Sequence, residues 1–208
     1  MNYLLNTNIV DPDQCVSLLR GSLKKKSSDA VEAVSGFHMT SEQKERVRII
    51  QGHFDDIDHR ITQLDEVIGN LVAGYEEQIA LLCTIPGIDR RTAITILSEI
   101  GTDMKEFGSS KRLCNWAGLA PANNQSAGKK KSVRTSRAGV YLKPALAEAA
   151  HAAVKSMEKH PYYRIKFERL MKRRGKERTI IAIARMILTA IYAMLSTGEV
   201  FNPCDLEK

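Results

Sequence analysis

The chain has 208 residues and a formal net charge of +7, and its 43% hydrophobic and 26% charged residues are typical of a globular protein with a real core. No apolar run approaches the roughly 20 residues of a membrane span, and the N-terminus lacks the pattern of a secretory signal, so we expect a cytoplasmic protein with no membrane partner. The cysteines are far apart and form no CxxC or Cys/His cluster, which argues against a disulfide framework and a zinc site.

Charge is divided unevenly along the chain. Residues 1–103 carry 10 basic and 16 acidic side chains, a formal charge of −6, whereas residues 104–208 carry 21 basic and 8 acidic side chains, a formal charge of +13. A basic block of this size indicates a polyanionic partner for the C-terminal half. The alternative is a well-solvated basic surface.

The sequence signals for helices are weak in the first 40 residues and strong in the segment that follows. Residues 1–40 are predicted to be poorly ordered or to form short helices that break at Gly21 and at Ser27–Ser28. Thr40 and Gln43 have the spacing of a capping box, in which each side chain binds the backbone of the other, and they predict the start of a long helix.

Residues 41–82 are predicted to form a coiled-coil helix. Apolar side chains recur there at alternating spacings of three and four over five heptads, interrupted once by Gln78. A helix of this length is a rod of roughly 60 Å, too long to bury against one small domain, so we expect homo-oligomerisation through it. The alternative is a long helix within a bundle, and Gly69 and Gly74 could mark a bend. The stripe consists of Val47, Ile50, Phe54, Ile57, Ile61, Leu64, Ile68, Leu71, Tyr75 and Leu82.

Residues 81–101 resemble a helix-hairpin-helix motif. A turn at Pro86–Ile88 separates two helices, and Asp89 is expected to cap the second. Gly87 and Ile88 would let backbone N–H groups approach a phosphate, and Arg90 and Arg91 would add charge beside it. The alternative is a helical hairpin that only packs within the domain.

The rest of the chain is also predicted to be helical, apart from one strip. Residues 109–121 are expected to form a short helix that starts at Ser109 or Ser110 and buries Leu113 and Trp116. Residues 118–139 are too polar and too rich in glycine for a helix, and we expect a flexible loop. Helical stretches follow at 140–159, 162–174 and 177–198, and the last is apolar almost all round from Ile180 to Leu195, so we expect it to be the central helix of the domain. The predicted fold class is mainly α, with a helical domain over 79–202.

The loop at 118–139 contains a candidate nucleophile. Ser126 precedes five cationic side chains, and a serine hydroxyl among cations can attack a phosphodiester because the cations stabilise the charge of the transition state. By chemistry alone Ser132 and Ser136 compete equally with Ser126, and polar loops contain many idle serines. The cations are Lys129, Lys130, Lys131, Arg134 and Arg137.

The order of the motifs narrows this choice. I-P-G-I-x-x-x-T-A, then W-A-G-L-A-P, then Q-S-A-G-K, then R-x-S-x-x-G-x-x-L-K resembles the C-terminal serine domain of the transposases of insertion sequence one-hundred-and-ten and its relatives, over about residues 79–200. The resemblance implies that Ser126 attacks DNA and becomes covalently linked to it, with DNA and an element-encoded guide RNA as partners. This chain has Ser-Ala-Gly where many relatives have Ser-Gly, so the backbone of the loop could differ slightly.

The resemblance also implies a domain that this sequence does not contain. Members of the family carry an N-terminal RNase-H-like (RuvC-like) domain with a DEDD set of carboxylates that binds a divalent metal such as magnesium. Nothing before residue 40 alternates like a strand that ends in a carboxylate. We therefore expect a C-terminal portion of such a transposase, with no metal site and no cofactor of its own and with incomplete activity alone.

Two other functions fit the sequence less completely. The chain could be a non-catalytic nucleic-acid-binding module that uses the 86–88 hairpin and the basic loop for affinity alone. It could also be a structural coiled-coil adaptor, although the basic C-terminal half argues against this.

Overall fold

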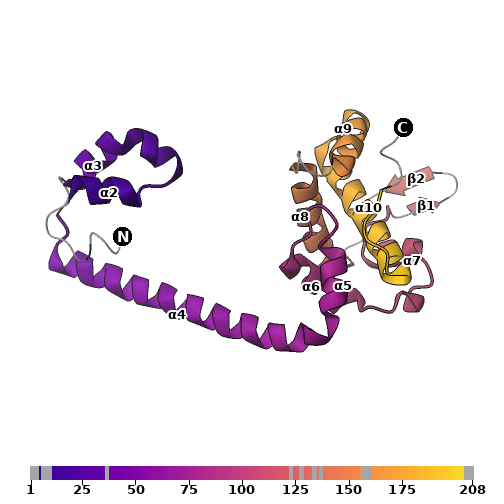
Figure 1. The fold of residues 1–208 in the computed structure, drawn as a ribbon. Helices are drawn as coiled ribbons and strands as arrows, with labels where there is room; N and C mark the ends of the chain where they lie inside the picture. Colours follow the sequence, from indigo (N-terminus) through magenta and orange to yellow (C-terminus); the bar gives the residue numbers. More distant parts are fainter. Residues whose placement is uncertain are drawn as a thin grey trace. The chain divides into compact units, whose positions relative to one another are not determined.

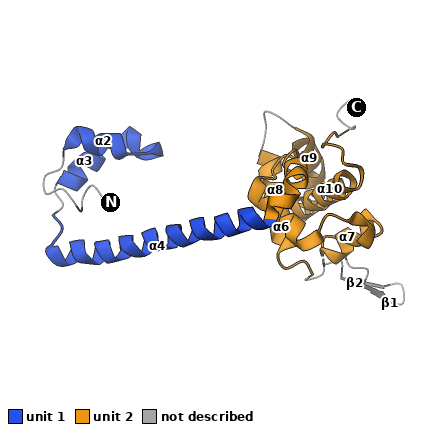
Figure 2. Cartoon of the chain, turned by 60° about the horizontal axis from the view of Figure 1, so that its bottom comes forward, with its two compact units in different colours: residues 1–71 blue, residues 72–208 orange. Residues whose placement is uncertain are grey.

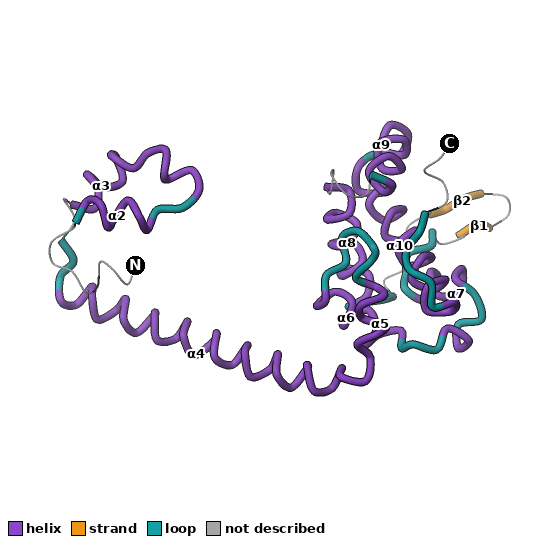
Figure 3. The backbone as a smooth tube through the Cα atoms, in the orientation of Figure 1, coloured by secondary structure: helices purple, strands orange, loops and turns teal. Residues whose placement is uncertain are grey.

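The computed structural model describes residues 5, 11–35, 38–121, 124–126, 129–132, 135, 138–155 and 161–203, with the backbone alone for 124–126 and 129–132. The chain divides into two compact units, Met1–Leu71 and Val72–Lys208 (Figure 2). We call them unit 1 and unit 2. The fold is mainly α, as predicted, and helix dominates the trace in both units (Figure 3).

Unit 1 begins with short helical segments. Helix α2 spans Pro12–Leu18, the 3-10 segment η1 spans Gly21–Lys26, and α3 spans Ser27–Ser35 (Figure 1). The side chain of Asp11 caps α2 by accepting a 3.0 Å hydrogen bond from the backbone N–H of Asp13. The predicted break at Gly21 corresponds to a non-helical stretch directly before this residue, whereas no break occurs at Ser27–Ser28, where the helix changes from 3-10 to α without interruption.

The long helix of unit 1 is α4, Ser41–Val72. The predicted capping box is confirmed: the backbone N–H of Gln43 donates to Thr40 Oγ1 at 3.2 Å, and the N–H of Thr40 donates to Gln43 Oε1 at 2.9 Å. None of the residues of α4 is buried, and its apolar stripe is exposed. The helical path continues through a 3-10 turn at Ala73–Tyr75, which contains Gly74, into α5 at Glu76–Leu82.

Unit 2 starts with the predicted helical hairpin. Helix α5 is followed by a turn and then by α6, Arg90–Ile100. Asp89 caps α6 as predicted, because its carboxylate accepts a 2.8 Å hydrogen bond from the backbone N–H of Thr92. Ile79 and Leu82 of α5 pack with Ala93, Ile96 and Ile100 of α6 in one buried cluster.

A 3-10 segment, η3 at Met104–Glu106, leads to α7 at Ser110–Trp116. Ser109 caps α7 by accepting a hydrogen bond from the backbone N–H of Arg112, and Leu113 is fully buried, both as predicted. The prediction that Trp116 is buried is wrong, because its side chain is 46% exposed. Trp116 packs instead against the ring of Phe107, with the centroids 5.6 Å apart, at the edge of the core.

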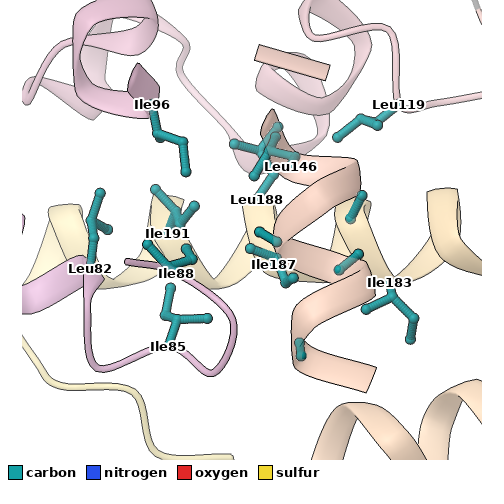
Figure 4. Close-up of a cluster of buried hydrophobic side chains, with 14 of the residues drawn as sticks. Leu82, Ile85, Ile88, Ile96, Leu119, Leu146, Ile183, Ile187, Leu188 and Ile191 are labelled. Atoms are coloured by element: carbon teal, nitrogen blue, oxygen red, sulfur yellow. The ribbon is translucent and has the colours of Figure 1, made fainter. Parts of the chain in front are cut away.

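Three helices complete unit 2: α8 (Leu142–Lys155), α9 (Tyr162–Arg174) and α10 (Lys176–Thr197). Helix α10 is the central helix, as predicted, and contacts α5, α7, α8 and α9. By length and composition α10 could cross a bilayer, but its apolar side chains are those of a core helix and pack within unit 2. Figure 4 shows Ile183, Ile187, Leu188 and Ile191 of α10 facing side chains of the other helices.

The polar strip at 118–139 is not wholly a loop. Residues Asn124–Ser126 form strand β1 and Lys129–Ser132 form strand β2, which pair in an antiparallel two-stranded sheet (Figures 1 and 3). Polarity and glycine content correctly excluded a helix. They did not predict the strands, because the segments lack the β-branched and aromatic residues typical of strands.

Candidate functional site

Ser126 is the last paired residue of β1. It pairs with Lys129 of β2, and the preceding Gln125 pairs with Lys130. The pairing then shifts, because Asn124 is opposite Ser132, so Lys131 is the extra residue of a bulge. The register therefore brings the predicted nucleophile and the first of the predicted cations together in one short hairpin.

The other predicted cations of the strip are only partly located. Lys130 and Lys131 lie on β2, on the strand opposite the serine. Arg134 and Arg137 lie outside the described residues. The hairpin thus brings the backbone of Ser126 close to that of the lysines, as predicted. The phosphate-binding role of these residues stays a prediction.

Both ends of the strip are tied to the helices of unit 2. Pro121 and Thr135 form an isolated antiparallel bridge, and Lys143 of α8 donates a 2.8 Å hydrogen bond to Thr135 Oγ1. Gly139 has a positive φ of 67°, and a Cβ added to it would lie 2.5 Å from the carbonyl oxygen of Ala117. The chain that leaves the strip therefore passes directly against the end of α7, so the helical body holds the base of the hairpin.

The hairpin at Pro86–Ile88 packs inside the domain. Gly87 has a positive φ of 87°, and a Cβ at this position would lie 2.3 Å from the carbonyl oxygen of Ala149 and 2.5 Å from the backbone nitrogen of Ala153. Ile88 is buried in the core. Gly87 therefore allows the backbone of α8 to approach closely, at positions where α8 carries alanines. This geometry supports the alternative that Gly87 and Ile88 serve packing within the domain.

Arg90 and Arg91 lie on the first turn of α6 and are exposed. The guanidinium group of Arg90 donates two hydrogen bonds to the carboxylate of Glu76, one from each terminal nitrogen. This pairing lowers the pKa of Glu76, because the hydrogen bonds stabilise its charged form. Arg90 thus joins α6 to α5, and binding of DNA by Arg90 or Arg91 stays a prediction.

The described residues also show a cationic site that sequence reasoning missed. A cavity of about 700 Å³ lies between the base of the hairpin and α10, and three arginines line it. The sequence showed a basic turn at 172–176 but not that Arg174, Arg178 and Arg185 line one cavity. The spacing of seven residues between Arg178 and Arg185 is a signal for these two, because it places their side chains on one face of α10, whereas Arg174 belongs to α9 and is brought near them only by the fold.

The residues that the structure describes form no candidate metal site. Within them, no three His, Cys, Asp or Glu side chains come together as a group that could hold a metal ion. The acidic side chains that contact other charged groups serve local structure instead. Glu76 binds Arg90, and Glu168 binds Arg164 within α9.

Comparison with known proteins connects these elements to a family. Residues 79–164 match the model of the "Transposase IS116/IS110/IS902 family". The chain is 36% identical over 164 residues to the "Pilin gene-inverting protein" of Moraxella bovis, a match that covers 71% of this chain and 48% of that protein. It is 28% identical over 146 residues to the "Transposase for insertion sequence element IS1111A" of Coxiella burnetii, which covers 66% of this chain and 40% of the relative. The chain thus spans about half or less of the length of these curated relatives.

Proposed function

We propose that this chain is the DNA-binding, serine-bearing part of an insertion-sequence transposase that cuts and exchanges DNA strands. The observation that carries the proposal is the position of Ser126. It lies inside the segment that matches the transposase family model, at the end of a short strand and paired with a lysine. The names of the relatives, a transposase and a gene-inverting protein, support the same class of reaction.

The proposed chemistry is transfer of a phosphodiester to the serine. The hydroxyl oxygen of Ser126 attacks the phosphorus atom and forms an O–P bond, while the bond from phosphorus to the leaving sugar oxygen breaks. The hydroxyl proton leaves to solvent, and the departing oxygen takes up a proton. Lys129, Lys130 and Lys131 would stabilise the negative charge that develops on the phosphoryl oxygens.

We propose that any metal chemistry of the reaction belongs to an RNase-H-like half. The resemblance implies a divalent ion, such as magnesium, held by carboxylates of an RNase-H-like half. The described residues of this chain gather no such carboxylates. No step that we propose for these residues passes through a metal ion, and cleavage by this chain alone is expected to be slow or absent.

We also propose that the chain assembles with a second copy through α4. Among the described residues of unit 1, none covers the heptad stripe of α4, and Ile50, Ile61 and Leu64 are each 45% exposed or more. A seam of a and d positions is what a coiled coil buries. An element-encoded guide RNA is a further proposed partner, which rests on the sequence resemblance and on the basic charge of residues 104–208.

A covalent-adduct assay tests the serine. The chain is mixed with an RNase-H-like half in trans, the element's RNA and end DNA, and the products are separated under denaturing conditions. Wild type should form a protein–DNA adduct, and Ser126→Ala should form none while DNA affinity stays nearly unchanged. Ser132→Ala and Ser136→Ala are matched controls, because they remove a hydroxyl from the same strip.

The outcomes separate the alternatives. An adduct with Ser126→Ala but not with Ser132→Ala or Ser136→Ala would mean that another serine is the nucleophile. An adduct with all three variants would reject covalent serine catalysis. DNA binding without an adduct from wild type would favour a non-catalytic nucleic-acid-binding module.

A further inference from the structure

The cavity between the hairpin base and α10 is built from three separate parts of unit 2. Leu119, Pro121 and Thr135 come from the strip that carries the hairpin, and α9 and α10 supply the facing wall. The volume of about 700 Å³ lies within the range of about 300–1,000 Å³ that is usual for ligand sites. The cavity is therefore large enough for a nucleotide or a short segment of a strand.

The charge on this wall is positive and is not used elsewhere. Among the described residues, Arg174, Arg178 and Arg185 line the cavity together with one carboxylate, Glu177, and these four side chains have a formal charge of +2. In the described part of the chain, no salt bridge and no side-chain hydrogen bond involves the guanidinium group of any of the three arginines. A guanidinium group binds phosphate with paired donors in a fixed plane.

Local structure fixes the spacing of the arginines. The hydroxyl of Thr179, which is fully buried, donates a 2.7 Å hydrogen bond to the carbonyl of Gly175, and this holds the start of α10 to the end of α9. Arg178 and Arg185 are two helical turns apart on α10, about 10 Å, which is comparable with the distance between nearby phosphates of one strand. Several phosphates of one strand could therefore contact the arginines together.

Helix α7 braces the inner end of the cavity. The Sγ atom of buried Cys114 lies 3.9 Å from the carbonyl oxygen of Arg185 and 3.7 Å from the hydroxyl of Thr189. Half-buried Arg185 is thus anchored through its backbone at the contact between α7 and α10. The rest of the wall is apolar, with Ile181 and Ala182 on α10, and would suit a sugar or a base next to the phosphates.

From this arrangement we infer that the cavity binds the sugar-phosphate backbone of the DNA strand on which Ser126 acts. The inference rests on the proposed function. Pro121 precedes Ser126 by five residues, so chain connectivity limits the separation of these two residues to about 18 Å, the length of a short stretch of strand. A strand held by Arg174, Arg178 and Arg185 would then pass the hairpin with its scissile phosphate at the serine. Such a site positions the strand and does not take part in bond cleavage.

Binding of a fluorescent single-stranded DNA oligonucleotide tests this site. Arg174→Gln/Arg178→Gln/Arg185→Gln should weaken binding at least about tenfold and should make the slope of log affinity against log salt shallower by about 2. The charge-matched control is Arg169→Gln/Lys172→Gln/Arg173→Gln, which changes exposed residues of α9 outside the cavity and should weaken binding less than about threefold. Ala182→Trp, which fills the cavity without removing charge, should also weaken binding and provides a second test if the triple variant does not fold.

The result is decided by the difference between the variants. The site would be overturned if the cavity variant and the control lost DNA affinity equally. It would also be overturned if DNA affinity stayed unchanged in both Ala182→Trp and the cavity variant. Loss of binding only to an RNA oligonucleotide of the same sequence, or displacement of the DNA by millimolar inorganic phosphate, would also overturn it as a DNA-strand site.

The adduct assay keeps this inference separate from the proposed function. Cavity-dependent DNA binding without a Ser126 adduct would reject the nucleophile and retain the strand site. If the chain forms a Ser126 adduct and its cavity variant binds DNA as tightly as the control variant, the strand site is rejected and the nucleophile is retained.

Discussion

Large aliphatic side chains are buried in unit 2, whereas side chains of the same kind are exposed along α4 of unit 1. Leu82 of α5 is 0% exposed. Leu71, which belongs to the apolar stripe and lies near the end of α4, is 73% exposed. Both belong to the same apolar repeat in the sequence. The comparison teaches that one regular pattern serves two purposes, because the end of the repeat is built into the core of a helical domain while most of it is left uncovered by the described residues of unit 1.

The largest expected effect tests whether a second copy covers the stripe of α4. Ile61→Asp places a charge in the proposed seam and should reduce the mass measured by light scattering about twofold, because an unpaired buried charge strongly destabilises such an interface. Gln63→Asp, also exposed on α4 but outside the stripe, should leave the mass unchanged. A wild-type chain that is already monomeric at tens of micromolar would contradict the assembly.

Leucine truncation compares the two regions directly. Leu82→Ala should destabilise unit 2 by about 2–5 kcal/mol, because it leaves a cavity in a closed core. Leu71→Ala should change the same transition by less than about 0.5 kcal/mol. The chain has one tryptophan, Trp116, and it lies in unit 2, so its fluorescence during denaturant unfolding reports this unit alone. Equal effects of the two substitutions would show that unit 2 does not unfold as a separate core.

Glycine substitution tests the contact between the 86–88 turn and α8. Gly87→Ala should cost about 2–4 kcal/mol, because the new methyl group meets backbone atoms and the positive φ disfavours alanine. Gly198 also has a positive φ, of 76°, with nothing within 4 Å of an added Cβ, so Gly198→Ala should cost only about 1 kcal/mol. Trp116 fluorescence measures both, and a Gly87→Ala cost no greater than the control would mean that the turn can move away from α8.

The smallest expected effect concerns the cap of α6. Hydrogen bonds from Thr92 lower the pKa of Asp89, so its contribution to stability is present above the unfolded pKa of about 3.9 and is lost as pH falls through the lower folded value. Asp89→Ala should cost about 1 kcal/mol at neutral pH. The difference between wild type and Asp89→Ala in denaturant titrations should shrink below about pH 4. Asp89→Asn keeps a capping oxygen and should be less destabilised at neutral pH; a constant difference across this range would contradict the charge contribution.

Much of the helical fold could be predicted because its signals are local. The capping groups at Thr40, Asp89 and Ser109 each make the hydrogen bond that their sequence position predicts. The apolar stretch at 177–198 predicted the central helix, because a helix that is hydrophobic all round requires burial on all sides. These features depend on residues a few positions apart.

The remaining features depend on distant segments. The motif around Gly87 predicts a phosphate-binding glycine. Only the position of α8, more than 50 residues later, shows that Gly87 packs against the backbone of that helix. The arginine cavity combines α9, α10 and the base of the hairpin, so no single stretch of sequence contains it. The strands form from polar residues because the helical body holds the ends of the strip together, which local propensity does not encode.

The central position of α10 has a consequence for the order in which unit 2 is made. Ribosomes synthesise the chain from its N-terminus, and among the helices of unit 2 α10 is the last to emerge. Helices α5, α7, α8 and α9 all pack against α10, so the parts of their apolar faces that α10 covers stay exposed until Thr197 has left the exit tunnel. At about 5–20 residues per second, the stretch from Leu142 to Thr197 takes roughly 3–10 seconds to translate. During that interval the nascent unit 2 exposes a half-built core, and the nascent chain is then a candidate client for chaperones that bind apolar segments.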